Sequence, residues 1–216
     1  MISVNIKKRL ITSFILIFLL IIIYFSNFVM FYSLIVLGVF SFVEFSNILK
    51  KIYKNTYKIF FLNLIFIIYI FIFCYIFYFA SNYFQVKVLL FCILFGCASS
   101  DMGGFIFGKI FKGPKLSKIS PNKTISGSIG SVLFTIIVLE SLIYYLTNNL
   151  SFEIFFIAII TSVACQIGDL FFSFLKRKAK IKDTGKFFPG HGGVLDRLDG
   201  IFLGLPIGLI STILIY

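Results

Sequence analysis

The feature that most constrains this chain is a succession of long apolar runs. Each is long enough to cross about 30 Å of hydrocarbon as a helix. They cover approximately residues 10–26, 28–48, 59–80, 88–108, 125–146, 152–175 and 195–216. With 60% hydrophobic and 13% charged residues among 216, the chain has more apolar side chain than a soluble domain of this length can bury. The sequence therefore predicts an all-α polytopic membrane protein with about seven transmembrane helices.

The positions of the basic residues predict the orientation of these helices. If the N-terminus is cytoplasmic, all but one of the 20 Lys and Arg residues fall on the cytoplasmic side, and only Lys87 lies opposite. This is the charge distribution that the positive-inside rule describes, and it puts the C-terminus on the opposite face. The basic N-terminus and first run resemble a signal peptide, but no small-residue cleavage site follows, so we expect the first span to remain as an anchor.

This topology suggests two parts. Residues 1–90 would form three N-terminal membrane helices, and residues 91–216 a catalytic membrane domain with basic cytoplasmic loops at 109–125 and 176–194. The net charge of +12 would then lie against the bilayer, which favours anionic lipid headgroups or a soluble polyphosphate over nucleic acid as partners.

Aspartates in the apolar runs are the sharpest chemical signal. Asp101 is expected about 12 Å below the cytoplasmic end of its helix, and Asp169 about 10 Å below the end of its own. Asp196 and Asp199 begin the last run three residues apart, a spacing that predicts one face of a helix. A carboxylate at such depth needs a partner, water or a cation. Salt bridges with Arg197 and nearby lysines are one explanation, but the clustering favours a divalent metal such as Mg²⁺.

A glycine-rich segment, Pro189-Gly190-His191-Gly192-Gly193, directly precedes these last aspartates. Glycine lets backbone N–H groups approach an anion closely, and the start of a helix favours negative charge. The segment therefore predicts a phosphate cradle. His191 is either a hydrogen-bonding turn residue or a proton carrier or phosphate donor, and the residues alone leave both open.

Three further sequence patterns concern a basic segment, helix packing and the cysteines. The basic segment 109–131 suggests phosphate contacts or a plain connector, and its hydroxyl residues suit the cap of the following helix. Small residues recur in the runs 88–108 and 195–216, which predicts close helix packing. The four cysteines lie in apolar runs without the spacing of metal ligands, so we expect buried, small hydrophobic side chains.

The charged segment as a whole resembles a known family. Ser173-Phe-Leu-Lys176-Arg177, then Lys182-Asp183, then Pro189-Gly-His191-Gly-Gly-Val-Leu-Asp196-Arg197-Leu-Asp199 is similar to the signature of the phosphatidate cytidylyltransferases, also called CDP-diacylglycerol synthases. Asp101 and the run Ile119-Ser120-Pro121-Asn122-Lys123-Thr124 resemble that family's upstream region, so the similarity covers about the C-terminal half. Ser126 stands where the family usually has Glu, Ser100 where Ala is usual, and the chain is shorter than the family by one or two N-terminal helices.

The resemblance implies that CTP and phosphatidate react to give CDP-diacylglycerol and diphosphate. The reaction would be Mg²⁺-dependent, with one metal or a pair, at the cytoplasmic face of a bacterial-type inner membrane. The implied metal ligands are Asp169, Asp196 and Asp199, with Asp101 and Asp183 as further candidates. The implied substrate contacts are Lys176, Arg177, Lys182 and Arg197 for phosphates, Ser120 and Lys123 for nucleotide or headgroup, and His191, Gly192 and Gly193 in the glycine-rich segment. The partners would be CTP, phosphatidate and anionic lipid, without nucleic acid, and the glycine faces permit a homodimer.

Two other functions fit parts of the sequence. A related CTP-dependent enzyme could use the same carboxylates on a polyprenol or ether-lipid phosphate. A small ion transporter would instead spread its acids through the bilayer, whereas all five aspartates are expected near one face. Only Glu44, Glu140 and Glu153 are expected elsewhere, so the enzyme is favoured.

Overall fold

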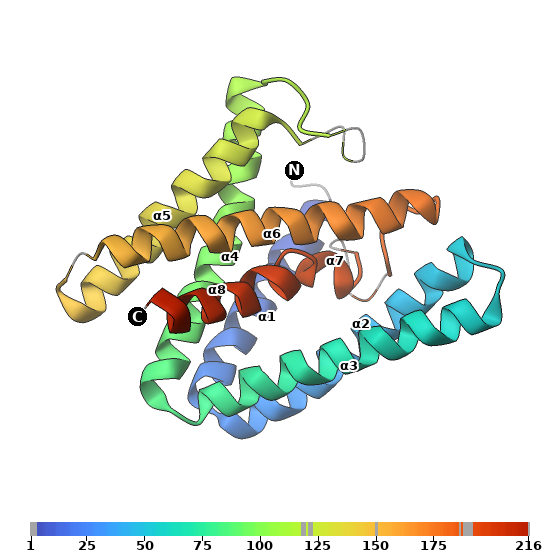
Figure 1. Ribbon diagram of the computed structural model, residues 1–216, viewed down its shortest axis with the longest axis horizontal. Helices are drawn as coiled ribbons and strands as arrows, with labels where there is room; N and C mark the ends of the chain where they lie inside the picture. Colours follow the sequence, from blue (N-terminus) through green and yellow to red (C-terminus); the bar gives the residue numbers. More distant parts are fainter. Residues whose placement is uncertain are drawn as a thin grey trace. The chain divides into compact units, whose positions relative to one another are not determined.

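The computed structural model describes residues 4–117, 120, 123–149, 151–185, 187 and 192–215, with backbone alone for residues 4–10. The chain divides into two compact units (Figure 1). Unit 1 comprises residues 1–83 and 175–198, and unit 2 comprises residues 84–174 and 199–216. The segment 175–198, which the sequence analysis grouped with the C-terminal helices, thus packs with the first three helices. The catalytic role assigned to residues 91–216 stays a prediction.

The described residues confirm an α-helical polytopic membrane protein. Six segments are long and apolar enough to cross a membrane: Asn27–Ile52, Thr56–Ser81, Phe84–Phe111, Ile125–Thr147, Phe152–Lys178 and Leu195–Ile215. The first predicted span coincides with α1 (Val4–Phe25). The apolar part of this helix, Ile11–Phe25, is shorter than the six segments above. The orientation of the termini stays a prediction.

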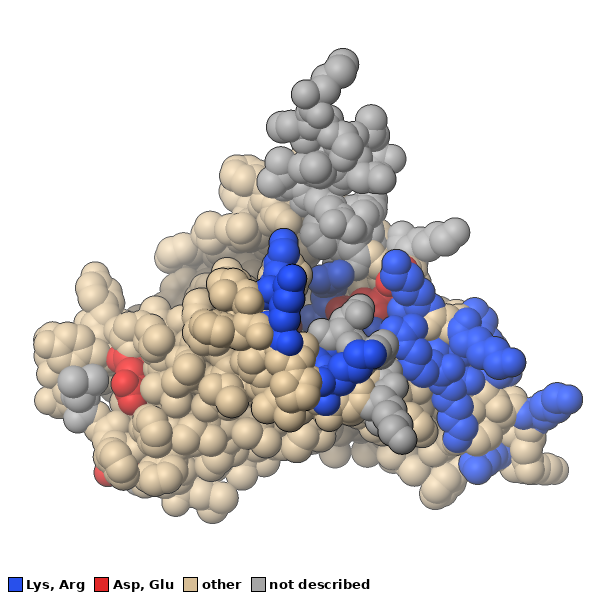
Figure 2. Space-filling view, turned by 90° about the horizontal axis from the view of Figure 1, so that it is seen from above, with Lys and Arg blue, Asp and Glu red and all other residues tan. Residues whose placement is uncertain are grey.

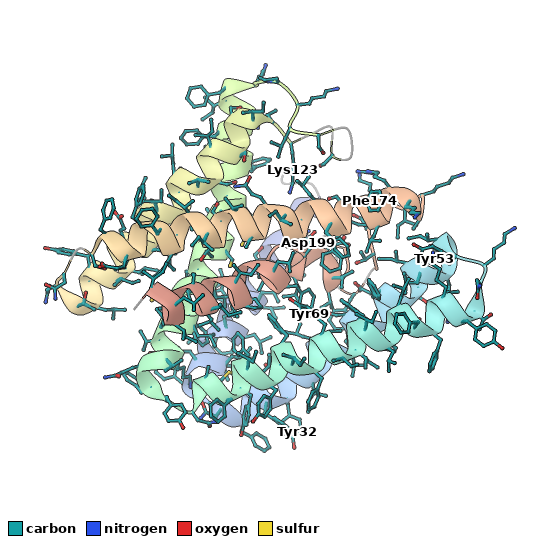
Figure 3. All side chains as sticks on the ribbon, in the orientation of Figure 1. Tyr32, Tyr53, Tyr69, Lys123, Phe174 and Asp199 are labelled. Carbon is teal, nitrogen blue, oxygen red and sulfur yellow. The ribbon has the colours of Figure 1, made fainter. Side chains whose placement is uncertain are left out.

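Large apolar side chains face outward along the long helices. In α3 (Thr56–Ser81) the side chain of Phe71 is 70% exposed, and in α5 (Ile125–Thr147) that of Ile137 is 63% exposed. Most of the surface in Figure 2 is correspondingly free of charge, and Figure 3 shows aromatic side chains projecting from α3. Such a surface is stable against lipid and would be unfavourable in water.

Unit 1 is built on α1, α2 (Asn27–Ile52) and α3, which follow one another through short turns. Ser26 caps α2 by accepting a hydrogen bond from the Val29 N–H, and Asn55 caps α3. These polar side chains satisfy N–H groups that a helix start leaves without intrahelical partners. The rings of Phe45 and Phe66 stack at 3.8 Å between centroids, where α2 and α3 lie side by side (Figure 1).

Unit 2 is held together by small residues, as the sequence predicts. In α4 (Phe84–Phe111), Gly103 lies against the Gly130 carbonyl and the Phe134 side chain of α5. Gly104 lies so close to Ser131 that a Cβ would come within 2.6 Å of its hydroxyl. Larger side chains at these positions would separate the two helices.

The last helix, α8 (Ile201–Ile215), uses its glycines in the same way. Gly204 lies against Cys165 of α6 (Phe152–Lys178) and Cys97 of α4. A Cβ on Gly208 would approach the Thr161 hydroxyl to 2.7 Å. Cys92, Cys97 and Cys165 are buried and free, which confirms their predicted character as small apolar side chains.

One prediction about the last run is wrong. Asp196 and Asp199 do not share the face of one helix, because α7 (Leu195–Leu198) ends before Asp199 and α8 begins after Gly200. Asp199 and Gly200 form a turn, in which the Gly200 N–H donates to the Asp199 carboxylate at 3.1 Å. A Cβ at position 200 would lie only 3.3 Å from the Cys165 carbonyl oxygen, so this turn depends on glycine.

Candidate functional site

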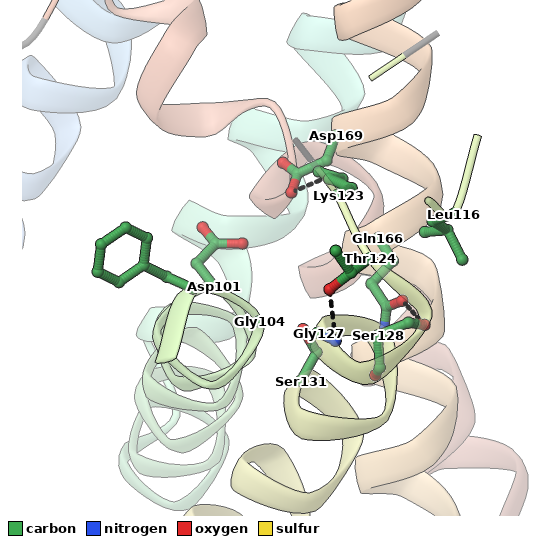
Figure 4. Close-up of a pocket in the computed structure, with 11 residues that line it drawn as sticks. Asp101, Gly104, Leu116, Lys123, Thr124, Gly127, Ser128, Ser131, Gln166 and Asp169 are labelled. Atoms are coloured by element: carbon green, nitrogen blue, oxygen red, sulfur yellow. Dashed lines mark hydrogen bonds and ion pairs between the residues drawn. The ribbon is translucent and has the colours of Figure 1, made fainter. Parts of the chain in front are cut away.

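Unit 2 contains a polar cavity of about 280 Å³, drawn in Figure 4. It lies among α4, α5, α6 and the residues that precede α5. Its lining combines acidic, basic, hydroxyl and amide side chains, which is typical of a binding site with orienting polar groups. The lining residues are Asp101, Gly104, Phe105, Leu116, Lys123, Thr124, Gly127, Ser128, Ser131, Gln166 and Asp169.

The backbone on both sides of Lys123 is fixed by hydrogen bonds across the loop that joins α4 to α5. The Leu116 N–H donates to the Lys123 carbonyl at 2.8 Å, and the Lys123 N–H donates to the Ser120 carbonyl at 3.0 Å. Thr124 then caps α5 by accepting from the Gly127 N–H at 3.1 Å, which confirms the predicted hydroxyl cap. The loop therefore presents Lys123 at a defined place on the cavity wall.

Lys123 and Asp169 form an ion pair inside this cavity. The lysine Nζ donates to the Asp169 carboxylate at 2.7 Å, and the two side chains are 30% and 17% exposed. Asp101, on α4, is an exposed side chain whose carboxylate is directed toward the same end of the cavity (Figure 4). Two of the predicted acidic residues and one predicted basic residue thus line one cavity.

The turn that carries Asp199 lies against the same part of α6. A Cβ on Gly200 would lie 3.0 Å from Asp169 Oδ1, and one on Gly168 would lie 2.5 Å from the Asp199 carbonyl oxygen. Glycine at both positions lets the two segments approach this closely. Asp169 and the backbone of Asp199 are therefore neighbours in unit 2, although 30 positions separate them in the sequence.

Position 126, where the resembled family usually has Glu, has a structural partner here. Ser126 Oγ accepts a hydrogen bond from the Gly113 N–H at 3.3 Å and lies 3.0 Å from the Thr124 hydroxyl. It thereby ties the end of α4 to the start of α5. Gln166, which the sequence analysis overlooked, donates from Nε2 to the Ser128 carbonyl at 3.3 Å and lines the same cavity.

Unit 1 contains a second lysine–aspartate pair. Lys176 Nζ donates to Asp196 Oδ1 at 2.7 Å, and the side chains are 13% and 7% exposed. The other carboxylate oxygen of Asp196 accepts the N–H groups of Thr184 at 2.8 Å and Gly193 at 3.0 Å. Three donors, the Lys176 ammonium and two backbone N–H groups, thus converge on one buried carboxylate, and the Thr184 hydroxyl oxygen lies 3.0 Å from it.

Three N–H groups at the start of α7, of which only that of Gly193 belongs to the predicted phosphate cradle, have acceptors within the chain, and the cradle itself stays a prediction. The N–H of Gly193 donates to Asp196, and those of Val194 and Leu195 donate to Glu44 of α2. The acceptors are the chain's own carboxylates, which already provide the negative charge that a helix start favours. Gly192, with φ of +85°, has the left-handed backbone that favours glycine.

Glu44 is the functional candidate that the sequence analysis missed. The expectation that it lies away from the other acids is wrong, because its carboxylate contacts the segment 184–195. The signal was present: Glu44 stands in an apolar run, where a charged side chain needs partners. The need of a buried charge for partners selected Asp101 and Asp169 from the sequence, and the same criterion would have selected Glu44.

The remaining predicted residues are placed as follows. Exposed side chains in unit 1 include those of Arg177, Lys182, Asp183 and Arg197, and Ser120 in unit 2 is partly buried. His191 lies outside the described residues. Among the residues that the structure describes, three or more His, Cys, Asp or Glu side chains nowhere gather as a metal cluster. A bound cation in unit 2 would therefore have few carboxylate ligands and would need oxygens from a substrate or water.

Sequence comparisons identify related proteins. A profile described as "Cytidylyltransferase family" matches residues 2–214. The phosphatidate cytidylyltransferase of Rickettsia felis is 45% identical over 137 residues, which cover 59% of this chain and 58% of the relative. That of Rickettsia typhi is 48% identical over 130 residues, or 56% of each chain. That of Staphylococcus haemolyticus is 41% identical over 110 residues, which cover 50% of this chain and 42% of the relative. The chain thus spans about half the length of the curated relatives it matches.

Proposed function

Since this chain belongs to the cytidylyltransferase family, we propose that it transfers the cytidylyl group of CTP to phosphatidate, giving CDP-diacylglycerol and diphosphate. The observation that carries the proposal is the polar cavity of unit 2, where the ion pair between Lys123 and Asp169 lies beside Asp101. The relatives named above are phosphatidate cytidylyltransferases, which supports phosphatidate as the acceptor.

The reaction needs no activated side-chain nucleophile. An oxygen of the phosphatidate phosphate attacks the α-phosphorus of CTP, a new P–O bond forms, and the bond to the β-phosphate oxygen breaks. The bonding electrons leave with diphosphate. The protein's contribution is to position two anionic substrates and to offset their charge.

Lys123 is suited to offset the negative charge of the substrates. Its ammonium group donates to Asp169 at 2.7 Å. A triphosphate in the cavity offers Lys123 a more highly charged acceptor, and the transfer of Lys123 to a phosphate oxygen would leave Asp169 available for a cation. Arg177, Lys182 and Arg197, all exposed in unit 1, are proposed as further phosphate contacts, together with Lys176, Ser120 and the segment that contains His191.

The carboxylates of unit 2 fit a magnesium ion. Mg²⁺ is commonly held by one or two carboxylates together with substrate phosphates and water. Asp169 would supply one carboxylate and Asp199, whose turn lies against the same part of α6, would supply a second, with Asp101 on the cavity wall. When bound, the ion would offset charge on the triphosphate and on the departing diphosphate. Asp196 of unit 1 is proposed as a further ligand.

The proposal places the reaction at the cytoplasmic face of a bacterial inner membrane. Phosphatidate lies in the bilayer and CTP is soluble, so the site must be reachable from both. The six long apolar helices support membrane insertion, and the predicted basic loops support the cytoplasmic face.

The test is an assay with CTP labelled at the α-phosphate and phosphatidate in detergent, with the labelled lipid separated from CTP. We expect product with Mg²⁺, and none after chelation with EDTA. Asp169→Ala and Asp199→Ala should each abolish product while the protein remains in the membrane fraction. Full activity in either variant would remove that residue from the site, and activity that survives EDTA would exclude the divalent metal.

Two controls make the assay specific. Glu153→Gln removes an exposed carboxylate from the opposite end of the helix that carries Asp169, and it should leave activity unchanged. A panel with polyprenyl phosphate and an ether-lipid phosphate separates the acceptors. Product with one of these and none with phosphatidate would overturn the proposed substrate.

A further inference from the structure

Glu44 is a buried charged side chain that the proposed chemistry does not use. It lies near the C-terminal end of α2, between apolar residues, and is 6% exposed. Isolation of a carboxylate from water is strongly unfavourable unless hydrogen bonds replace the lost solvent. The residues that donate these hydrogen bonds therefore indicate the structural role of Glu44.

Among the described residues, its hydrogen-bond donors come from one distant segment. Glu44 Oε1 accepts the Val194 N–H at 3.0 Å, and Oε2 accepts the Leu195 N–H at 2.9 Å. The hydroxyl of Thr184 donates to Oε2 at 2.6 Å. Thr184 is 140 positions from Glu44 in the sequence. One carboxylate of α2 thus fixes both ends of the segment 184–195, all within unit 1.

Thr184 links Glu44 to the second carboxylate, Asp196. The Thr184 N–H donates to Asp196 Oδ2 at 2.8 Å, while the single hydroxyl proton of Thr184 lies between the two acids. The hydroxyl oxygen is 2.6 Å from Glu44 and 3.0 Å from Asp196, so the shorter bond assigns this proton to Glu44. Asp196 is then oriented by backbone N–H groups whose positions Glu44 secures.

The shape of the segment also depends on Glu44. A Cβ at Gly193 would overlap both Glu44 carboxylate oxygens and the Thr184 hydroxyl, and one at Gly185 would overlap Glu44 Oε1. Glycine at these positions lets the backbone close around the carboxylate. The fit is mutual, because a longer side chain on either partner would push the segment away.

We infer that Glu44 is a positioning residue: by holding Thr184 and the first N–H groups of α7, it sets the direction of the Asp196 carboxylate. The inference rests on the proposed function, in which Asp196 acts on the substrates or their cation. Glu44 itself need not touch either substrate.

Two measurements on the full-length protein test this role. The first is hydrogen exchange of peptides that cover residues 184–196, without substrate or metal. We expect faster exchange in both variants, because Glu44→Ala removes both acceptor oxygens for the N–H groups of Val194 and Leu195, and Glu44→Gln removes one of them. The second is steady-state kinetics, in which kcat should fall, by roughly 100-fold in Glu44→Ala as for a misplaced catalytic group, while the KM for CTP stays close to the wild-type value.

A double-mutant cycle asks whether Glu44 acts through Thr184. Thr184→Val removes the hydroxyl and keeps the backbone N–H that Asp196 accepts. The losses from Glu44→Gln and Thr184→Val should be less than additive, because each removes the same hydrogen bond. Should Glu44→Ala fail to fold, the Gln and Val variants carry the test. Additive losses would contradict the proposed link.

Ser41→Ala is the matched control. Ser41 is buried in α2 one turn before Glu44, and its hydroxyl has no hydrogen-bond partner among the described residues. This variant should leave both exchange and kcat unchanged. Unaltered exchange in the Glu44 variants, or faster exchange with wild-type kcat, would overturn the inference. If the wild-type protein does not use phosphatidate, the proposed function fails, while the exchange data still decide whether Glu44 holds the segment.

Discussion

Two lysine–aspartate pairs within the described part of the chain have the same length and different surroundings. Each joins Nζ to a carboxylate oxygen at 2.7 Å. Around Asp196, two backbone N–H groups add to the lysine, and the side chain is 7% exposed. Asp169 instead meets its lysine at the wall of a cavity, where Lys123 is 30% exposed.

This difference in surroundings indicates different roles for the carboxylates of Asp196 and Asp169. Asp196 is held in one direction by donors that belong to the fold, so its position is set before any substrate arrives. The pair in the cavity is more exposed to solvent, at 30% and 17% for its two side chains, and ion pairs contribute less to stability as their exposure increases. It can exchange partners at low cost, as the proposed chemistry requires. Stability measurements should therefore respond to the Asp196 pair, and substrate affinity to the Lys123 pair.

The largest difference is expected between Asp196→Ala and Asp169→Ala. Removal of Asp196 takes one acceptor from Lys176 and from two backbone N–H groups, and the loss of one partner of a buried pair costs about 3–5 kcal/mol of unfolding free energy. Asp169→Ala should change that free energy by no more than about 1 kcal/mol. Thermal or denaturant unfolding of both variants in detergent measures the contrast. Equal destabilisation would show that the two environments do not differ in the way described.

Replacement of each lysine by methionine should give a smaller difference in unfolding free energy than replacement of the aspartates. The larger loss is again expected for the pair that contains Asp196. Lys176→Met removes a hydrogen bond between charged groups, worth about 1.5–3 kcal/mol, while the backbone donors to Asp196 remain. Lys123→Met should leave stability nearly unchanged and raise the KM for CTP by about 10-fold, the equivalent of 1.4 kcal/mol. Unfolding curves and initial rates for the two variants separate these outcomes. A KM unchanged by Lys123→Met would place the triphosphate elsewhere.

The sequence alone was sufficient to predict the helices and to select single charged residues of the cavity. It was not sufficient to predict which distant residues contact one another. Helix number and position follow from apolar run length, which is a local property. Asp169 and Lys123 could be selected one by one, as an acid in an apolar run and a base in a loop, although their pairing could not. Glu44 could not be linked to Thr184, since no spacing rule spans 140 positions. The turn at Asp199 was missed for the same reason: the three-residue spacing is compatible with a helix, and the break is stabilised by α6, which lies against Gly200.

The smallest of the expected effects concerns the glycines that shape the two sites. Gly192 has φ of +85°, and a Cβ there would lie 2.9 Å from the Asp196 carboxylate. Gly192→Ala should therefore lower the unfolding free energy by about 1–2 kcal/mol, the usual penalty for left-handed backbone in an L-residue. Gly113→Ala is the control near the cavity of unit 2, because its Cβ would lie 3.1 Å from the Ser126 hydroxyl and 3.5 Å from the Ser126 backbone nitrogen. It should cost less than Gly192→Ala in the same unfolding assay. A larger loss for Gly113→Ala would mean that the loop between α4 and α5, and not the segment around Asp196, is the rigid part of the protein.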